Sequence, residues 1–274
     1  MNNIRIAIIM SVYKNDVVEY VKLSVESILN QTYKDVDLYL QYDGPIQSEV
    51  DEYLSTLADE RLNILRREEN KGLAQSLNDL LSVVMPMGYQ YIARMDADDI
   101  SELDRLEKQM AYLQRNPDVD CVGGAINEID ENGQNRGKVT SYPISPDETR
   151  AFFCKRNPVA HPAVLMRRSL FEKAGGKYPM DFERNEDTML WYKAYLGGAR
   201  IANLPDVVLN FRMTNAMFTQ RRNGKAFAKS QLEMRKIINK NLGYGMIASV
   251  YAYAMYSLMI SPSWLLKLAY KVLR

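Results

Sequence analysis

Three aspartates stand within four positions of one another directly after an apolar segment of this chain. Asp96, Asp98 and Asp99 follow residues 91–95, YIARM, which have the composition of a short buried strand interrupted by Arg94. Like charges this close repel one another, so the cluster needs a cationic partner. Carboxylate oxygens suit hard divalent ions such as Mg2+ and Mn2+, which typically use one or two carboxylates together with substrate phosphate. The cluster therefore predicts a site for a metal ion and a diphosphate.

Helix capping is the alternative explanation of these acids. Asp98 and Asp99 precede the helical run ISELDRLEKQ, and Asp is a favoured cap. A single cap does not require three acids after a buried strand, which favours the metal. We expect Asp99 to be the one that caps, and Asp96 and Asp98 to be the ligands.

The single histidine, His161, lies in the segment NPVAHPAVLMRR. A buried structural histidine is the default interpretation, and a metal ligand or diphosphate contact is the alternative. One histidine and two cysteines, Cys121 and Cys154, are too few for a structural zinc site. A serine hydrolase would need a G-x-S-x-G turn, which the chain lacks. Paired carboxylates also occur in glycosidases, but a glycosidase would not explain an acidic cluster of the metal-binding type.

Strand-like and helix-like segments alternate through the first half of the chain and would position these side chains. Strands are predicted at 4–13, 36–43, 61–68 and 89–96, and helices at 17–31, 48–59, 73–85 and 102–116. This alternation predicts an α/β fold with a mostly parallel sheet and helices on both faces. Beyond it we expect a strand at 119–127, helices starting at 145 and 185, and a strand at 201–213.

Ligands of open α/β sheets bind where parallel strands end. The ends of three of the predicted strands carry polar residues, at 11–13, 43–44 and 96–99. The first strand is followed by SVYKND, so the glycine-rich turn of a dinucleotide-binding fold is absent, and no P-loop motif occurs. The site must therefore hold phosphate by other means.

Five blocks of the sequence resemble those of one enzyme family. IIMSVY, YDG, NKGLAQSLN, ARMDADD and NEDTMLWYK occur in the order and rough spacing of family 2 glycosyltransferases with the GT-A fold. The resemblance covers roughly residues 3–215 and is greatest to bacterial enzymes that build exopolysaccharide, capsule and O-antigen units, the amylovoran-synthesis type. It implies a nucleotide-diphospho-sugar transferase fold for 1–215 and leaves 216–274 as an appended tail.

The resemblance also implies roles for residues at the donor side. Ser11, Tyr13 and Asp43 would contact the uracil and ribose of a UDP-sugar, and Asp96 the ribose, metal and diphosphate. Asp98 and Asp96 would hold the metal, with His161 as a further candidate ligand. Arg94 either reaches the diphosphate or pairs with the aspartates. The chain departs from the usual pattern at two places, with Tyr42 where a second aspartate is common and Pro45 where Ser or Thr is common.

The pair Glu186-Asp187 matches the acidic motif of the family at the start of a helical run. The resemblance makes Asp187 the general base, which takes the proton of the attacking hydroxyl in an inverting transfer, and Glu186 its neighbour at the acceptor side. A helix N-terminus favours the ionised form, so we expect Asp187 to be charged near neutral pH. Helix capping is the alternative. Trp191, one turn further on, is either a platform for an acceptor sugar or a core residue.

Basic residues are concentrated in the last part of the chain. Residues 216–274 hold ten basic residues and one acid, Glu233, which leaves 25 basic and 33 acidic residues for the first 215. Residues 241–266 carry no charge, and SWLLKLAYKVLR at 263–274 has the pattern of a basic amphipathic helix. The tail predicts association with an anionic membrane surface. Its apolar part could instead pack on the catalytic domain or form a homodimer.

The combined prediction is a metal-dependent, inverting glycosyltransferase at the cytoplasmic face of the bacterial inner membrane, peripheral or monotopic. It would move one hexose or N-acetylhexosamine, with galactose slightly favoured, from a UDP-sugar to a polyprenyl-diphosphate-linked saccharide, with Mn2+ or Mg2+ as cofactor. The processive signature Q-x-x-R-W is only partly echoed by TQRRNGKAF. The alternatives are a sugar nucleotidyltransferase and a non-catalytic membrane scaffold. A nucleic-acid binder could also use the basic tail, and we expect no such partner.

Overall fold

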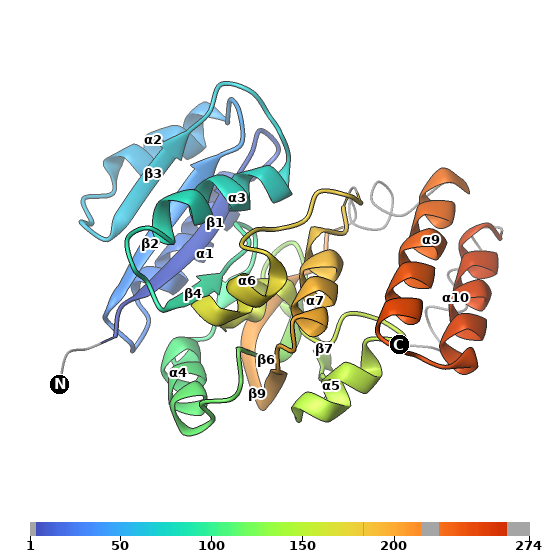
Figure 1. The fold of residues 1–274 in the computed structure, drawn as a ribbon. Helices are drawn as coiled ribbons and strands as arrows, with labels where there is room; N and C mark the ends of the chain where they lie inside the picture. Colours follow the sequence, from blue (N-terminus) through green and yellow to red (C-terminus); the bar gives the residue numbers. More distant parts are fainter. Residues whose placement is uncertain (1–3, 183, 215–224, 262–274) are drawn as a thin grey trace.

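The computed structural model describes residues 4–182, 184–214 and 225–261, and a β-sheet forms its centre (Figure 1). The strands are β1 (Ile6–Val12), β2 (Val36–Tyr42), β3 (Leu62–Arg66), β4 (Tyr91–Arg94), β5 (Ile100–Ser101), β6 (Cys121–Ile129), β7 (Asn135–Thr140), β8 (Leu165–Arg167) and β9 (Ile201–Arg212). Their order in the sheet is β3-β2-β1-β4-β8-β6-β9-β5, with β7 paired to β6.

The first half of the sheet is parallel. Strand β1 pairs in parallel with β2 and with β4, and β2 pairs in parallel with β3. Strands β1, β2 and β4 are almost entirely buried, which is the pattern of strands covered on both faces. The predicted alternation of strands and helices is confirmed for this half, and it brings the ends of β1, β2 and β4 to one edge.

The second half is mixed. Strand β8 runs antiparallel to both β4 and β6, β5 runs antiparallel to β9, and β6 and β9 are parallel. The sheet is thus mostly parallel, as predicted, with antiparallel insertions. Strands β5 and β8 have two and three residues. Such short strands are too short to show a period-2 pattern in the sequence.

Helices cover both faces of the sheet, as predicted. They are α1 (Val18–Leu29), α2 (Ser48–Thr56), α3 (Leu73–Val84), α4 (Arg105–Arg115), α5 (Pro146–Phe152), α6 (Arg168–Ala174), α7 (Glu186–Leu196), α9 (Lys225–Asn241) and α10 (Met246–Met259). Helices α1, α2 and α4 share one hydrophobic cluster with the sheet. Helices α3, α6 and α7 share the other and lie on the viewer's side of the sheet in Figure 1.

The C-terminal helices α9 and α10 pack against each other beside α7 (Figure 1). Met234 and Ile238 of α9 are 1% and 0% exposed and belong to the same hydrophobic cluster as α7. Part of the predicted tail therefore packs on the body of the protein. Within the described ranges no helix is both long enough and apolar enough to cross a membrane. The predicted amphipathic helix at 263–274 lies outside the described residues, as do Arg221 and Arg222.

Candidate active site

The three aspartates converge in the turn that follows β4. Ligand oxygens of Asp96, Asp98 and Asp99 all lie within 4.8 Å of one another. Asp96 and Asp98 are partly exposed, whereas Asp99 is buried. An arrangement of two accessible carboxylates backed by a buried one fits a hard divalent ion, and the predicted acidic cluster is confirmed as a cluster.

Two side chains from distant elements hold this turn in place. The Ser24 hydroxyl on α1 donates to the carbonyl of Asp96 at 2.8 Å. Arg212, at the end of β9, donates its Nε to the carbonyl of Asp98 at 2.8 Å and its backbone N–H to Oδ1 of Asp99 at 2.8 Å. The Arg212 guanidinium is buried and lies 4.1 Å from the centre of the Tyr20 ring. Sequence reasoning missed Arg212, although a charged residue in the apolar run VVLNFRM was a signal.

Asp99 does not cap a helix, contrary to prediction. Helix α4 begins only at Arg105, because Ile100 and Ser101 are extended and pair with β9. Oδ2 of Asp99 has no hydrogen-bond partner among the described atoms. Burial, followed by the charges of Asp98 and Asp96, raises the pKa of Asp99 well above its usual value. A bound cation would reverse this tendency, because it stabilises the carboxylate form.

Arg94 lies beneath the acidic turn and is 2% exposed. It forms an ion pair with Asp96, while its Nε and Nη1 have no hydrogen-bond partner among the described residues. Burial lowers the pKa of Arg94, but Asp96, Tyr178 and Asp99 together outweigh burial and the net pKa is raised, so the guanidinium is charged. Buried donors are rarely left unpaired. The ion pair with Asp96 is therefore observed, and two further nitrogens, Nε and Nη1, have N–H groups that could donate to an anionic oxygen.

A second arginine, Arg105, supports Arg94 and was not foreseen. It is 0% exposed and donates its Nη2 to the carbonyl of Arg94 at 2.9 Å and to that of Val164 at 3.1 Å. Burial, followed by the charge of Arg94, lowers the pKa of Arg105 to about 9.

The pair Glu186-Asp187 starts α7 and faces the same region. Oδ2 of Asp187 accepts from Nδ2 of Asn157 at 2.8 Å, and Oδ1 accepts from the Thr188 N–H at 2.6 Å. Burial raises the pKa of Asp187 and outweighs the hydrogen bond from Thr188 and the charge of Arg94. The expected preference for the ionised form at the helix N-terminus is therefore opposed by burial. A carboxylate with a raised pKa is a stronger base.

Glu186 interacts electrostatically with residues of both acidic motifs. Burial, followed by Asp187, raises the pKa of Glu186, and the charges of Arg94 and Asp96 also act on it. Arg94 thus lies within electrostatic reach of the acidic turn and of both residues at the start of α7. Segments about 90 positions apart in the sequence therefore lie within electrostatic reach of one another.

The predicted donor residues lie at the ends of the neighbouring strands β1 and β2, with Ser11 among the last residues of β1 and Tyr13 and Asp43 directly after their strands. Ser11 is half-buried, and Tyr13 is 36% exposed at the edge of the site. Asp43 is buried, and its Oδ1 accepts from the backbone N–H groups of Lys71 and Gly72 at 2.8 and 3.2 Å. The loop before α3 is therefore fastened to the end of β2. Tyr13 has an accessible ring, as a residue that stacks on a base requires.

Asp43 also forms an ion pair with Arg67, which in turn binds Asp79 at 2.6 Å. Gly44, with φ of 79°, lies so close to this loop that an added Cβ would be 2.6 Å from the backbone nitrogen of Asn70. A side chain at position 44 would therefore push the loop away from Asp43.

His161 and Trp191 lie in the core. His161 is 7% exposed, its Nε2 is 3.0 Å from the Tyr178 hydroxyl, and its ring meets Trp191 edge-on at 5.9 Å. Burial, followed by Arg94, lowers the pKa of His161 well below its usual value, so the ring is neutral. Trp191 is 0% exposed, which corrects its prediction as a sugar platform. The metal-ligand prediction for His161 does not fit either, because the ring packs against Tyr178, outside the acidic cluster.

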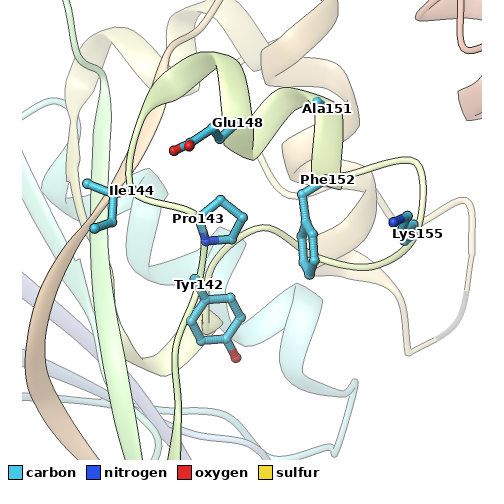
Figure 2. A pocket seen from close by; sticks show the side chains of 7 residues that line it. All are labelled: Tyr142, Pro143, Ile144, Glu148, Ala151, Phe152 and Lys155. Carbon is cyan, nitrogen blue, oxygen red and sulfur yellow. The ribbon is translucent and has the colours of Figure 1, made fainter. Parts of the chain in front are cut away.

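A separate hollow of about 530 Å³ lies beside α5 (Figure 2). Figure 2 shows Tyr142, Pro143 and Phe152 along it, and Glu148 near its rim. The Glu148 carboxylate is already engaged with the backbone N–H and hydroxyl of Ser145, at 3.0 and 2.8 Å, in a helix cap. None of the residues expected at the donor or acceptor side lines this hollow.

Comparison with known proteins decides the family. The model of the family described as "Glycosyl transferase family 2" matches residues 7–175. The chain belongs to glycosyl transferase family 2. This result confirms the resemblance seen in the motifs and the assignment as an enzyme of the glycosyltransferase class. The match includes the ends of β1, β2 and β4 and the acidic turn.

Curated relatives of this glycosyltransferase cover most of its length. The amylovoran biosynthesis glycosyltransferase AmsE of Erwinia amylovora is 32% identical over 84% of this chain and 84% of its own. The O-antigen biosynthesis glycosyltransferase WbnJ of Escherichia coli is 35% identical over 77% of this chain and 80% of its own. A UDP-Gal:alpha-D-GlcNAc-diphosphoundecaprenol beta-1,3-galactosyltransferase of Escherichia coli is 26% identical over 84% of this chain and 81% of its own.

Solved structures confirm the fold of this glycosyltransferase. The crystal structure of S. aureus TarS 1-349 in complex with UDP-GlcNAc superposes with a TM-score of 0.66 at 15% identity, over 92% of this chain and 70% of that one. The GT-A-like architecture, with a mixed and mostly parallel sheet, is therefore shared at the level of the fold.

Proposed function

We propose that this enzyme transfers a single hexose or N-acetylhexosamine, with inversion, from a UDP-sugar to a polyprenyl-diphosphate-linked saccharide in the biosynthesis of a surface polysaccharide. One observation carries the proposal: the buried Arg94 pairs with Asp96 of the acidic turn and also acts electrostatically on both Glu186 and Asp187. A cationic centre within electrostatic reach of a metal-type cluster and of a partly buried carboxylate base is what diphosphate departure and hydroxyl attack require.

The donor would lie across the ends of β1, β2 and β4. Tyr13 offers a ring for the uracil, and Ser11 and Asp43 border the position of the nucleoside. Asp96 and Asp98 would hold Mn2+ or Mg2+, which fits their convergent oxygens, and when bound this ion would offset the negative charge of the diphosphate. The unpaired Nε and Nη1 of Arg94 would donate to its phosphate oxygens.

Asp187 would act on the acceptor. Its carboxylate takes the proton of the acceptor hydroxyl while the hydroxyl oxygen forms a bond to the anomeric carbon. The bond from that carbon to the diphosphate oxygen breaks on the opposite face, and UDP leaves with the electron pair. The hydrogen bonds from Asn157 and Thr188 keep the carboxylate oriented. Glu186 would border the acceptor sugar.

The substrate classes are supported by relatives. One is named as using UDP-Gal and a GlcNAc-diphosphoundecaprenol acceptor, and two are named for amylovoran and O-antigen biosynthesis. These names favour galactose as the sugar and a lipid-linked acceptor. The TarS complex with UDP-GlcNAc keeps N-acetylglucosamine as the next donor to test.

A donor panel tests the function. With Mn2+ present, we expect one UDP-sugar to raise the melting temperature and to be hydrolysed slowly to UDP, and EDTA to abolish both effects, because Asp96 and Asp98 bind the diphosphate through the ion. GDP- and dTDP-sugars are the controls. Release of pyrophosphate from a nucleoside triphosphate would instead identify a nucleotidyltransferase, and no response to any nucleotide would leave a non-catalytic scaffold.

The uncharged helix α10 supports a peripheral position at the cytoplasmic face of the inner membrane. Met246, Ile247, Val250 and Tyr253 are between 50% and 85% exposed and recur along one side of the helix. Exposed lysines of α9 lie on the neighbouring helix, with Lys236 4.9 Å from the Tyr253 ring. An apolar face flanked by cations fits an anionic lipid surface.

Acidic substitutions on this face test membrane binding. We expect the double variant Ile247→Asp and Val250→Asp to lose co-sedimentation with vesicles of anionic lipid, because each carboxylate must leave water on binding. Gln114→Asp, exposed on α4, is the control and should bind as the wild type does. If the wild type ignores vesicles but forms a dimer that the double variant disrupts, the face is a homodimer interface and the membrane proposal is wrong.

A further inference from the structure

One face of α9 is built into the catalytic body. Gln231, Met234, Arg235 and Ile238 recur at intervals of three and four residues, which places them on one side of the helix. Nε2 of Gln231 donates to Oδ1 of Asn185 at 2.8 Å, and Asn185 immediately precedes the Glu186-Asp187 pair. Met234 and Ile238 fill the hydrophobic cluster that α7 also lines. The C-terminal region therefore contacts the segment that carries the candidate base.

Arg235 differs in position from the lysines of the same helix. Lys225, Lys229, Lys236 and Lys240 are exposed, whereas Arg235 turns inward. Its Nη1 donates to the carbonyl of Phe153 at 2.7 Å, and its guanidinium lies 5.4 Å from the centre of the Phe153 ring. The expectation that the basic residues of the tail meet an anionic membrane therefore does not hold for Arg235. Both contacts hold its charge at a defined place beside α7.

That charge acts on Asp187. Burial lowers the pKa of Arg235, and Asp187 is the foremost group that opposes this effect. The effect is mutual. Burial has the largest effect on the pKa of Asp187, followed by Thr188 and Arg94, and the charge of Arg235 also lowers this pKa, which favours the carboxylate form. An opposite charge in a partly desolvated region acts more strongly than in water.

The other groups around this pair come from several elements. Glu186 is next to Asp187 on α7, Arg94 ends β4, and Tyr178 precedes α7. Tyr244, Tyr251 and Cys154 face Arg235. Arg94 is expected to be engaged by the diphosphate and Asp96. Arg235 acts on Asp187 from the C-terminal helix α9, and no contact with the donor is assigned to it.

We propose that Arg235 is a positioning residue for the base: anchored on Phe153, it stabilises the ionised carboxylate of Asp187, and α9 thereby becomes a working part of the acceptor side of the active site. The inference rests on the proposed role of Asp187. It implies that the C-terminal region does more than attach the enzyme to a surface, because the helix that leads into α10 also holds the base.

Two substitutions separate charge from packing. Arg235→Gln removes the charge but keeps an N–H donor for the Phe153 carbonyl, and Arg235→Lys keeps the charge. Lys240→Gln removes an exposed charge from the same helix and is the control. Each full-length variant is assayed without vesicles for kcat against pH and for donor KM. The carboxyl carbon of Asp187 is titrated in parallel by NMR of aspartate-labelled protein, with Asp187→Asn to assign the signal.

The expected results distinguish an effect of the Arg235 charge from an effect of its packing. In Arg235→Gln, the acidic limb of the kcat profile and the NMR titration of Asp187 should both move to higher pH, and kcat on that limb should fall by about 10-fold for each pH unit of the shift, with donor KM unchanged. Arg235→Lys should restore both curves, and Lys240→Gln should leave them as in the wild type. Folding is checked by the retained Mn2+-dependent stabilisation by UDP.

One outcome would contradict the role of Arg235, and a different outcome would contradict the proposed function of the site. An unchanged NMR titration in Arg235→Gln would show that Arg235 only packs, whatever happens to kcat. A shifted titration in a protein whose wild type transfers no sugar would leave the coupling between Arg235 and Asp187 intact and remove the proposed function of the site.

Discussion

Replacement of Asp187 by Asn should lower the rate of sugar transfer by about 10²–10⁴-fold and leave UDP-sugar binding nearly unchanged. The amide cannot accept the proton of the acceptor hydroxyl, but it fills the same space and can keep a hydrogen bond to Thr188. The donor residues on β1, β2 and the acidic turn are untouched. Steady-state transfer to a lipid-linked acceptor, together with calorimetric titration of the UDP-sugar, measures both quantities.

The matched control for this variant is Asp147→Asn. Asp147 is the second residue of α5, as Asp187 is the second residue of α7, but it is exposed and away from the site. It should keep the wild-type rate. Transfer at a normal rate in Asp187→Asn would show that Asp187 is not the base.

The dependence of the wild-type rate on pH follows from the same residue. A base works in its ionised form, so kcat should rise with pH through the pKa of Asp187. Burial raises that pKa, so the rise should occur above the usual range of a free aspartate, near pH 3.9. The rise should be absent from the residual activity of Asp187→Asn.

Replacement of Asp98 by Asn should abolish the metal-dependent response to the donor. Mutation of a residue that hydrogen-bonds to a metal ligand commonly lowers the affinity for the metal by 10–100-fold. Loss of the ligand itself should therefore lower the affinity for Mn2+ by at least about 100-fold. Stabilisation by UDP with Mn2+ should disappear, and transfer should fall with it. The metal-free protein should not be less stable, because the substitution also removes a charge that repels Asp99 and Asp96.

Asp104→Asn is the control for the acidic turn. Asp104 lies six positions further on, is partly exposed and pairs with Lys108 on α4 at 3.0 Å. This variant should respond to Mn2+ and UDP as the wild type does. Persistence of the full Mn2+-dependent stabilisation in Asp98→Asn would contradict the assignment of Asp98 as a ligand.

The site also shows where residue-level expectations failed. For Trp191 and His161 two interpretations were open, and burial decides for the core in both cases, because α7 turns its apolar side toward the sheet and the His161 ring lies 3.0 Å from the Tyr178 hydroxyl. Asp99 stands before a helical pattern, yet the next two residues join β9 and delay the helix to Arg105. In each case a partner far along the chain overrode a local pattern.

The order of strands and helices in the first half, the acidic cluster, the Glu186-Asp187 pair and the family could all be predicted from the amino-acid sequence. These features depend on local spacing and hydrophobic periodicity, which a chain displays without being folded. The tertiary structure alone decided which groups lose contact with water. Arg212 reaches Asp99 across 113 positions, Arg94 keeps two unpaired donors beneath the turn, and α9 brings Arg235 to Asp187. Burial and long-range charge set the chemistry of a site, and they exist only once distant segments have packed together.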